Sequence, residues 1–195
     1  HGRNCMDTVV AHRAAPDKRT FGLVVFLAAE SMTFAGLISA HIILRPGQEA
    51  WPPPGQPRLP AGMTAVATAF LLISAWTAYR ALSRAGEAQG AEKPWLGATW
   101  ALGALFLGIQ GVEWAQLIGH GLTMTSSVYG ALFYTVIGFH ALHVAIGMCI
   151  LSVTSVKALA GRYGPDEHTG VRLCAVYWWY VVLVWPTLYV LVYLL

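Results

Sequence analysis

The stretch Ser127–Gly147, SVYGALFYTVIGFHALHVAIG, is apolar almost throughout, yet it carries two histidines near its middle. These are His140 and His143, whose three-residue spacing puts both imidazoles on one face of an α-helix. Glycine and alanine recur along the stretch, and small residues let helices pack closely in lipid. A segment this apolar is long enough to cross a membrane. Its two imidazoles therefore need neighbours from other helices of a bundle.

The composition is that of an integral membrane protein. Hydrophobic residues make up 56% of the 195 positions and charged residues only 11%, whereas a soluble domain carries about 25% charged residues. The three scattered cysteines include no CxxC pair and predict neither a disulfide framework nor a zinc site. The sequence has no basic surface interleaved with aromatic residues, so a nucleic-acid partner is not expected.

Five long apolar runs predict an all-α bundle of five transmembrane helices. The expected spans are about 20–44, 62–82, 95–119, 128–156 and 173–195, which form one membrane domain over residues 20–195 after a polar tail over residues 1–19. All but two of the twelve lysines and arginines then lie on the side of the N-terminus; the exceptions are Arg45 and Arg58. The positive-inside rule places the N-terminus in the cytoplasm and the C-terminus outside.

Glu30 lies about eleven residues, or roughly 16 Å, into the first span and so near mid-membrane. Phe34 and His41 fall on nearly the same helix face. An ionised residue in the bilayer costs on the order of 2.5–3.5 kcal/mol, so Glu30 is protonated, paired or facing a hydrated cavity. Two interpretations stay open: a proton-exchanging or gating carboxyl beside a proton path, and a hydrogen-bonded residue that joins two helices.

The third span carries a polar stripe within an arc of about 120°. Its members are Gln110, Glu113, Gln116 and His120. Glu113 is either a structural hydrogen-bond partner for a neighbouring helix, with His140 and His143 as candidate partners, or a proton-transfer group. In the first case the contact would be a buried Glu–His pair, in which removal of one partner strands the other.

His140 and His143 invite a haem or metal interpretation, because imidazole is the commonest metal ligand. One helix supplies at most two ligands through this pair, and further ligands have to come from across the bundle. The remaining histidines lie outside the spans or towards the outer face; they are His1, His12, His41, His120 and His168. Structural hydrogen bonding is therefore the prediction, with no metal bound by this chain.

The last span contains an aromatic run, Tyr177-Trp178-Trp179-Tyr180. Such a run is typical of an interfacial belt or of packing between helices. With Arg172 nearby, Tyr177, Trp178 and Trp179 are also candidates for contact with a phospholipid headgroup and its acyl chains.

Five motifs together resemble subunit III of the haem–copper oxidases, the family of cytochrome c oxidase and quinol oxidase. In family order they are FLAAESMTFAGL around Glu30, WPPPG at Trp51–Gly55, LGIQGVEWAQLI around Glu113, SVYGALFYTVIGFHALHVAIG around His140, and YWWYVVLVWPTLYVLVYLL at the end. The chain is similar to the shorter five-helix form, without the first two helices of seven-helix members. In the family those two helices help enclose a V-shaped cleft that holds phospholipids; here another subunit would have to supply half of it.

The resemblance implies a subunit with no redox centre that docks on catalytic subunit I, which holds the haems and copper, beside other oxidase subunits in the bacterial cytoplasmic membrane. In the family this subunit sustains proton uptake and protects the oxidase from inactivation during turnover. Glu30 matches the family's carbodiimide-reactive buried carboxylate. Glu113, His140 and His143 match its Glu and the two His of its GFHxxHV motif.

The last helix departs from the family pattern YWHFVD. Trp179 stands at the His position and Val182 at the Asp position. The last helix therefore lacks two polar groups that most members have, and a role of this helix in proton transfer is in doubt.

Other functions remain open alongside a cytochrome c oxidase subunit. Within the same superfamily these are a quinol oxidase subunit III and an accessory protein of nitric-oxide reductase. A stand-alone transporter using Glu30 and Glu113 as proton relays would be active when reconstituted alone. A haem-binding membrane cytochrome would show a Soret band in the isolated chain.

Overall fold

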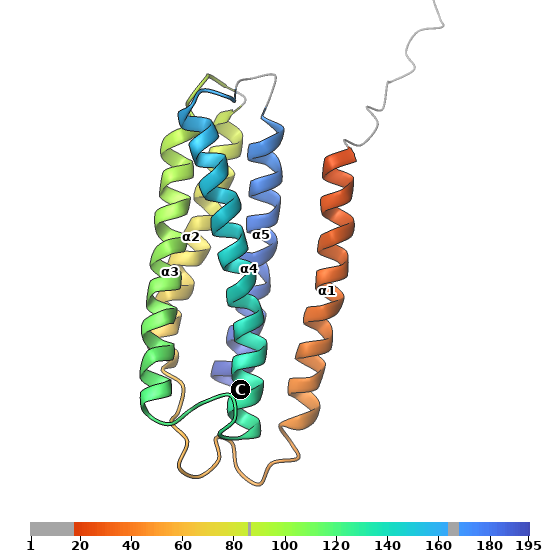
Figure 1. Ribbon diagram of the computed structural model, residues 1–195, viewed down its shortest axis with the longest axis vertical. Coiled ribbons are helices and arrows are strands. Elements are labelled where there is room, and N and C mark those ends of the chain that lie inside the picture. The colour runs from red at the N-terminus through yellow and green to blue at the C-terminus, as the bar shows by residue number, and fades with distance from the viewer. Residues whose placement is uncertain (1–17, 86, 164–167) are drawn as a thin grey trace, which may run out of the picture.

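The computed structural model describes residues 18–85, 87–163 and 168–195, and in this part of the chain every regular element is helical (Figure 1). The elements are α1 Lys18–Leu44, α2 Ala61–Ala85, α3 Lys93–Gly119, α4 Val128–Leu159 and α5 Thr169–Tyr189, and α5 continues into a short π-helix, η1 Val190–Leu194. Five helices are long and apolar enough to cross a membrane. The predicted all-α, five-span fold is confirmed; most of the predicted tail, residues 1–17, lies outside the described residues.

Local signals fix the two ends of α4. The side chain of Ser127 accepts a hydrogen bond from the backbone N–H of Gly130 at 3.1 Å, which is the arrangement of an N-cap. At the other end Gly161 adopts φ +69°, in the left-handed region that favours glycine. The helix therefore runs three residues beyond the predicted end at residue 156.

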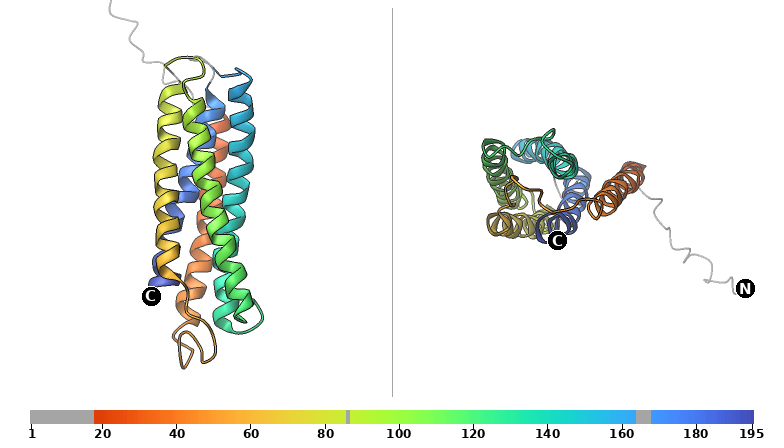
Figure 2. Two further views of the ribbon diagram at one scale, coloured as in Figure 1. Left: turned by 90° about the vertical axis from the view of Figure 1, so that its left-hand side faces the viewer. Right: turned by 90° about the horizontal axis from the view of Figure 1, so that it is seen from below.

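Helices α2 to α5 form a four-helix group, and α1 stands beside it (Figures 1 and 2). The main contacts of α1 are with α4 and α5. Only Leu27, Phe34 and His41 are buried on α1, and they recur every seven residues along one narrow stripe. The rest of α1 presents apolar side chains outwards, as suits a helix surrounded by lipid or by another membrane chain.

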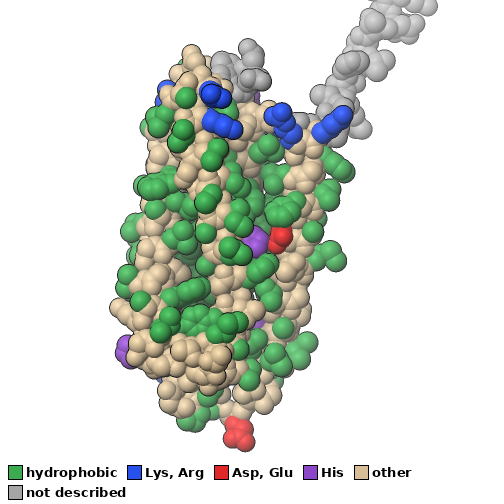
Figure 3. Space-filling model, in the orientation of Figure 1, with side chains coloured by type: hydrophobic (Ala, Val, Ile, Leu, Met, Phe, Trp, Pro, Cys, Tyr) green, Lys and Arg blue, Asp and Glu red, His purple; other side chains and the backbone are tan. Residues whose placement is uncertain are grey.

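The first helix begins at one end of the bundle and the chain finishes at the other (Figure 1). On the face shown in Figure 3, lysine and arginine side chains gather at the end where α1 begins. This arrangement is the one from which the positive-inside rule predicts a cytoplasmic N-terminus.

Trp178 of α5 is the centre of the four-helix packing and is 1% exposed. Two glycines on facing helices make room for its ring. A Cβ atom on Gly103 would lie 2.7 Å from Trp178 Cη2, and one on Gly147 would lie 3.0 Å from its Cε3. The indole Nε1 donates a hydrogen bond to Ser74 Oγ on α2 at 3.0 Å. This one side chain therefore ties α5 to α2, α3 and α4.

Candidate functional site

Glu30 of α1 and His143 of α4 form a polar pair about midway along the bundle. Glu30 Oε2 lies 2.9 Å from His143 Nε2. The other imidazole nitrogen, Nδ1, lies 2.8 Å from the carbonyl oxygen of Phe139 and therefore carries a hydrogen that it donates there. One further proton lies between Nε2 and the carboxyl oxygen, whichever atom holds it. The pair is thus neutral overall or a matched ion pair, and both forms leave no net charge in the membrane.

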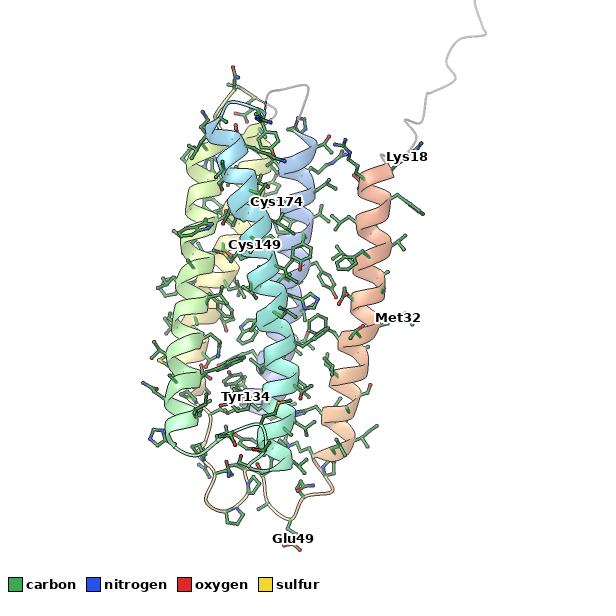
Figure 4. All side chains as sticks on the ribbon, in the orientation of Figure 1. Lys18, Met32, Glu49, Tyr134, Cys149 and Cys174 are labelled. Atoms are coloured by element: carbon green, nitrogen blue, oxygen red, sulfur yellow. The ribbon has the colours of Figure 1, made fainter. Side chains whose placement is uncertain are left out.

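Aromatic rings hold this pair in place but leave it partly open. The ring of Phe34 packs edge-on against His143 with centroids 5.2 Å apart, and Phe139 lies 4.7 Å from the same imidazole. The Glu30 side chain keeps 21% of its surface exposed, against 6% for His143. Figure 3 shows an acidic side chain touching a histidine halfway along this face. Met32, which follows Glu30 by two residues on α1, points away from the bundle (Figure 4).

Glu113 of α3 lies in a second polar cluster, in which it bonds to α2 and η1 rather than to the candidate partners His140 and His143. Its carboxyl Oε2 accepts a hydrogen bond from Thr64 Oγ1 of α2 at 2.8 Å. Its Oε1 accepts one from the Tyr193 hydroxyl of η1 at 2.7 Å. Gln110 Nε2 donates to the same hydroxyl at 3.1 Å, so Gln110 does join Glu113 in one network.

The two histidines of α4 point to different surroundings. His140 is buried, and its ring stacks on Trp185 of α5 with centroids 4.9 Å apart and planes 28° from parallel. Neither of its nitrogens has a hydrogen-bond partner among the described residues. Because His143 uses both nitrogens for Glu30 and Phe139, the two imidazoles do not converge on a common ligand position. Within the described ranges, no group of three or more His, Cys, Asp and Glu side chains could hold a metal ion.

Thr64 and Tyr193 are the site residues that sequence reasoning missed. Thr64 lies in an Ala- and Thr-rich span where one hydroxyl does not stand out. Tyr193 reaches Glu113 from the π-helix that begins four residues after Pro186, a residue that cannot donate a backbone hydrogen bond. A π-turn changes the direction of the side chains beyond it. The proline was the one visible signal that the end of this helix departs from regular geometry.

The residues predicted to contact lipid lie in different surroundings, and only some of them can reach lipid. Trp178 lies in the interior, so it is not placed to touch lipid. Trp179 is half-buried and donates from Nε1 to the carbonyl oxygen of Ala75 at 3.0 Å. Tyr177 lines an apolar groove of about 450 Å³ between α1, α4 and α5. Arg172 does not line that groove and donates to Thr20 Oγ1 of α1 at 3.2 Å.

The apolar groove meets a cationic hollow at the end of the bundle where α1 begins. Lys157 and Tyr163 line both, and Arg19 and Arg162 line the hollow, which has a volume of about 250 Å³. Burial raises the pKa of the Tyr163 hydroxyl, so the hydroxyl stays protonated and able to donate a hydrogen bond. Cys149 and Cys174 line the groove from facing helices, α4 and α5 (Figure 4).

Together these features define a multi-pass membrane protein in which two buried carboxyl groups, those of Glu30 and Glu113, are hydrogen-bonded to neighbouring helices. Comparison with known proteins identifies the class further. Residues 9–195 match the family model described as cytochrome c oxidase subunit III, and the chain belongs to this family. Membership makes it a membrane subunit of a multi-subunit oxidase complex in a respiratory chain.

Relatives named cytochrome c oxidase subunit 3 are similar over most of their length. The protein from Synechocystis sp. is 38% identical over 187 residues, which cover 94% of this chain and 78% of the relative. The Thermostichus vulcanus protein is 37% identical, with 92% and 89% covered. The Corynebacterium diphtheriae protein is 33% identical, with 94% and 91% covered.

Proposed function

We propose that this chain is the non-redox subunit III of a bacterial cytochrome c oxidase in the cytoplasmic membrane. It docks on the catalytic subunit, which holds the haems and copper, binds phospholipid, and supports proton uptake and stability during turnover. The observation that carries the proposal is the partly exposed Glu30–His143 pair at mid-depth. A carboxyl and an imidazole that share a proton and keep contact with the surface can exchange that proton.

The same pair supports a role beside another chain rather than alone. Glu30 belongs to α1, which has only one stripe of buried residues. The remaining surface of α1 is open to contact with another chain. The Glu113 cluster belongs to a different part of the molecule, between α2, α3 and η1. The described residues thus place the two carboxyls in separate networks rather than in one relay, which favours the subunit over a stand-alone proton transporter.

Purification in mild detergent through a tag on this chain tests the docking. The visible spectrum and mass spectrometry of the co-purifying proteins are the measurements. A haem-bearing catalytic subunit in stoichiometric amount is expected, and its sequence identifies the electron donor as cytochrome c or quinol. A colourless, monodisperse chain purified alone would contradict the proposal and favour the transporter.

Lipid binding is expected at the groove with the cationic hollow. The apolar groove suits an acyl chain, and the side chains of Lys157 and Arg162 suit a headgroup phosphate. Each cation near an anionic lipid contributes about 1 kcal/mol, or roughly a fivefold change in affinity.

Lys157→Gln with Arg162→Gln should therefore reduce retention of anionic phospholipid roughly 25-fold. The measurement is native mass spectrometry of the complex during stepwise delipidation. Lys93→Gln is the matched control, because Lys93 lies at the start of α3 and lines neither the groove nor the hollow. Equal lipid retention in all three proteins would show that this hollow does not bind the headgroup.

A further inference from the structure

We propose that Glu113 is a buried proton-binding site, a carboxylic acid that is protonated at neutral pH and whose hydrogen bonds are arranged so that it can gain or lose its proton without movement of the surrounding side chains. This inference goes beyond the proposed function and does not depend on it, because its readout is the protonation of one side chain. It is carried by the hydrogen-bond geometry around the carboxyl group and by the absence of a cation beside that group among the described residues.

The carboxyl group of Glu113 has no accessible surface and contacts only uncharged groups among the described residues. Its two oxygens face the hydroxyls of Thr64 and Tyr193. The ion pairs found in the described ranges are Glu30–His143 and Arg84–Glu87, so Glu113 has no cationic partner within 4 Å there. Burial of a carboxylate without a cation is costly, and the neutral acid avoids most of that cost.

The hydrogen bonds around Glu113 can be completed in both protonation states. Gln110 donates to the Tyr193 hydroxyl, which leaves that hydroxyl's single hydrogen for Oε1. Thr64 Oγ1 has two acceptors within reach, Glu113 Oε2 at 2.8 Å and the carbonyl oxygen of Pro60 at 3.1 Å. If the carboxyl is ionised, Thr64 donates to Oε2. If Oε2 is protonated, it donates to Thr64, whose own hydrogen turns to Pro60.

The switch between these states needs only the rotation of one hydroxyl group. No side chain has to move, and both carboxyl oxygens, the Thr64 and Tyr193 hydroxyls and Gln110 Nε2 keep a hydrogen-bond partner in either state. A carboxyl group that served only to join helices would need one protonation state. This arrangement accommodates the gain and the loss of a proton.

A cavity lies near this network without reaching the carboxyl group. Tyr193, Trp51, Arg58 and Tyr129 line a hollow of about 170 Å³ beside the loop of residues 45–60. Glu113 does not line this hollow and stays buried among its hydrogen-bond partners.

Towards the opposite end, large rings fill the interior. Phe106 lies seven residues before Glu113 on α3 and packs edge-on against Trp185 with centroids 5.0 Å apart. Both rings are buried, and Trp185 lies 6.3 Å from the Tyr193 ring. These rings therefore shield the carboxyl group of Glu113 on that side.

The other titratable groups near the network are accounted for. On α4, His140 is stacked on Trp185 and has no hydrogen bond to Glu113. On α5, the Tyr189 hydroxyl donates to the carbonyl oxygen of Ala61. On the connecting loop, Arg58 lines the cavity rather than the carboxyl site.

Infrared spectroscopy of the tagged membrane complex tests the proposal, with glutamate side chains labelled with ¹³C so that their carbonyl bands can be recognised. At neutral pH we expect a neutral carboxylic-acid band in the wild type that is lost in Glu113→Gln and that shifts in D₂O. A wild-type spectrum without that band, or a band that D₂O does not shift, would overturn the proposal.

Two milder variants keep the test decisive if Glu113→Gln does not accumulate. Tyr193→Phe and Thr64→Val each remove one hydrogen bond to the carboxyl group, so each should move the band to higher frequency without abolishing it. Tyr134→Phe is the control, because that hydroxyl donates to the carbonyl oxygen of Leu122 instead. A band that stays in place in both milder variants does not come from Glu113 and would overturn the assignment.

Discussion

Gly103→Val is expected to destabilise the four-helix group by about 1–3 kcal/mol, the usual cost of extra carbon atoms in a packed core. The new Cβ would lie 2.7 Å from both Met148 Sδ and Trp178 Cη2. Met148 is flexible and can move, but Trp178 is fixed by its bond to Ser74. The ring therefore has to shift, and its contacts with three helices shift with it.

Gly108→Val is the matched control. Gly108 lies on the same helix, and a Cβ there meets nothing within 4 Å. Both variants replace a helical glycine by valine, so the change in helix propensity is the same and only the packing differs. The measurement is thermal unfolding in detergent, followed by helical circular dichroism. Equal melting temperatures for the two variants would show that the contact at Gly103 is not restrictive.

Glu30→Gln should leave assembly and the initial rate nearly intact, and should shorten the working life of the complex or alter proton uptake. Glutamine keeps a hydrogen bond to His143 Nε2 but cannot exchange a proton there. The measurements are the initial rate, the proton stoichiometry and the activity remaining after many turnovers. Glu49→Gln is the control, because Glu49 lies in the connecting loop at the end of the molecule (Figure 4). If Glu30→Gln equals the wild type in all three, Glu30 only joins α1 to α4.

His143→Ala should be the more harmful change to the same pair. It leaves the Glu30 carboxyl near mid-membrane without its partner, and removal of one member of a buried pair typically costs 3–5 kcal/mol. Because Glu30 is partly exposed, we expect the lower end, about 3 kcal/mol. The double variant Glu30→Gln, His143→Ala should recover part of this loss. Measured stabilities that are additive across the cycle would contradict a direct interaction.

The number and approximate bounds of the helices could be predicted because membrane insertion depends on hydropathy summed over about 20 residues. The face of α1 was also predictable. Phe34 and His41 share its buried stripe, and Glu30 lies close enough to reach the adjacent helix. Helical spacing within one segment determines such relations, and no knowledge of the neighbouring helix is needed.

Partners between helices could not be predicted in the same way. The histidines named as candidate partners of Glu113 do not contact it, because the choice of partner depends on how the helices are rotated about their axes, and packing decides that rotation. Tyr193 could not be predicted as a partner of Glu113 for a further reason. The π-helix after Pro186 breaks the regular helical spacing on which such a prediction rests. The aromatic run did contain a usable signal. Four consecutive helical residues span about 300° around the axis, so one of them had to face the interior, as Trp178 does.

The narrow stripe by which α1 meets the bundle has a consequence for biogenesis. A membrane chain is synthesised from its N-terminus, so α1 enters the bilayer before the four helices that follow it, but its main contacts are with α4 and α5. Until α4 and α5 arrive, the Glu30 carboxyl has no imidazole beside it. Helix α1 therefore stays in lipid with an unpaired acid until α4 and α5 are inserted, and it can dock on them only then. Mutations in α5 should consequently act on the retention of α1, although more than a hundred residues separate the two helices in the chain.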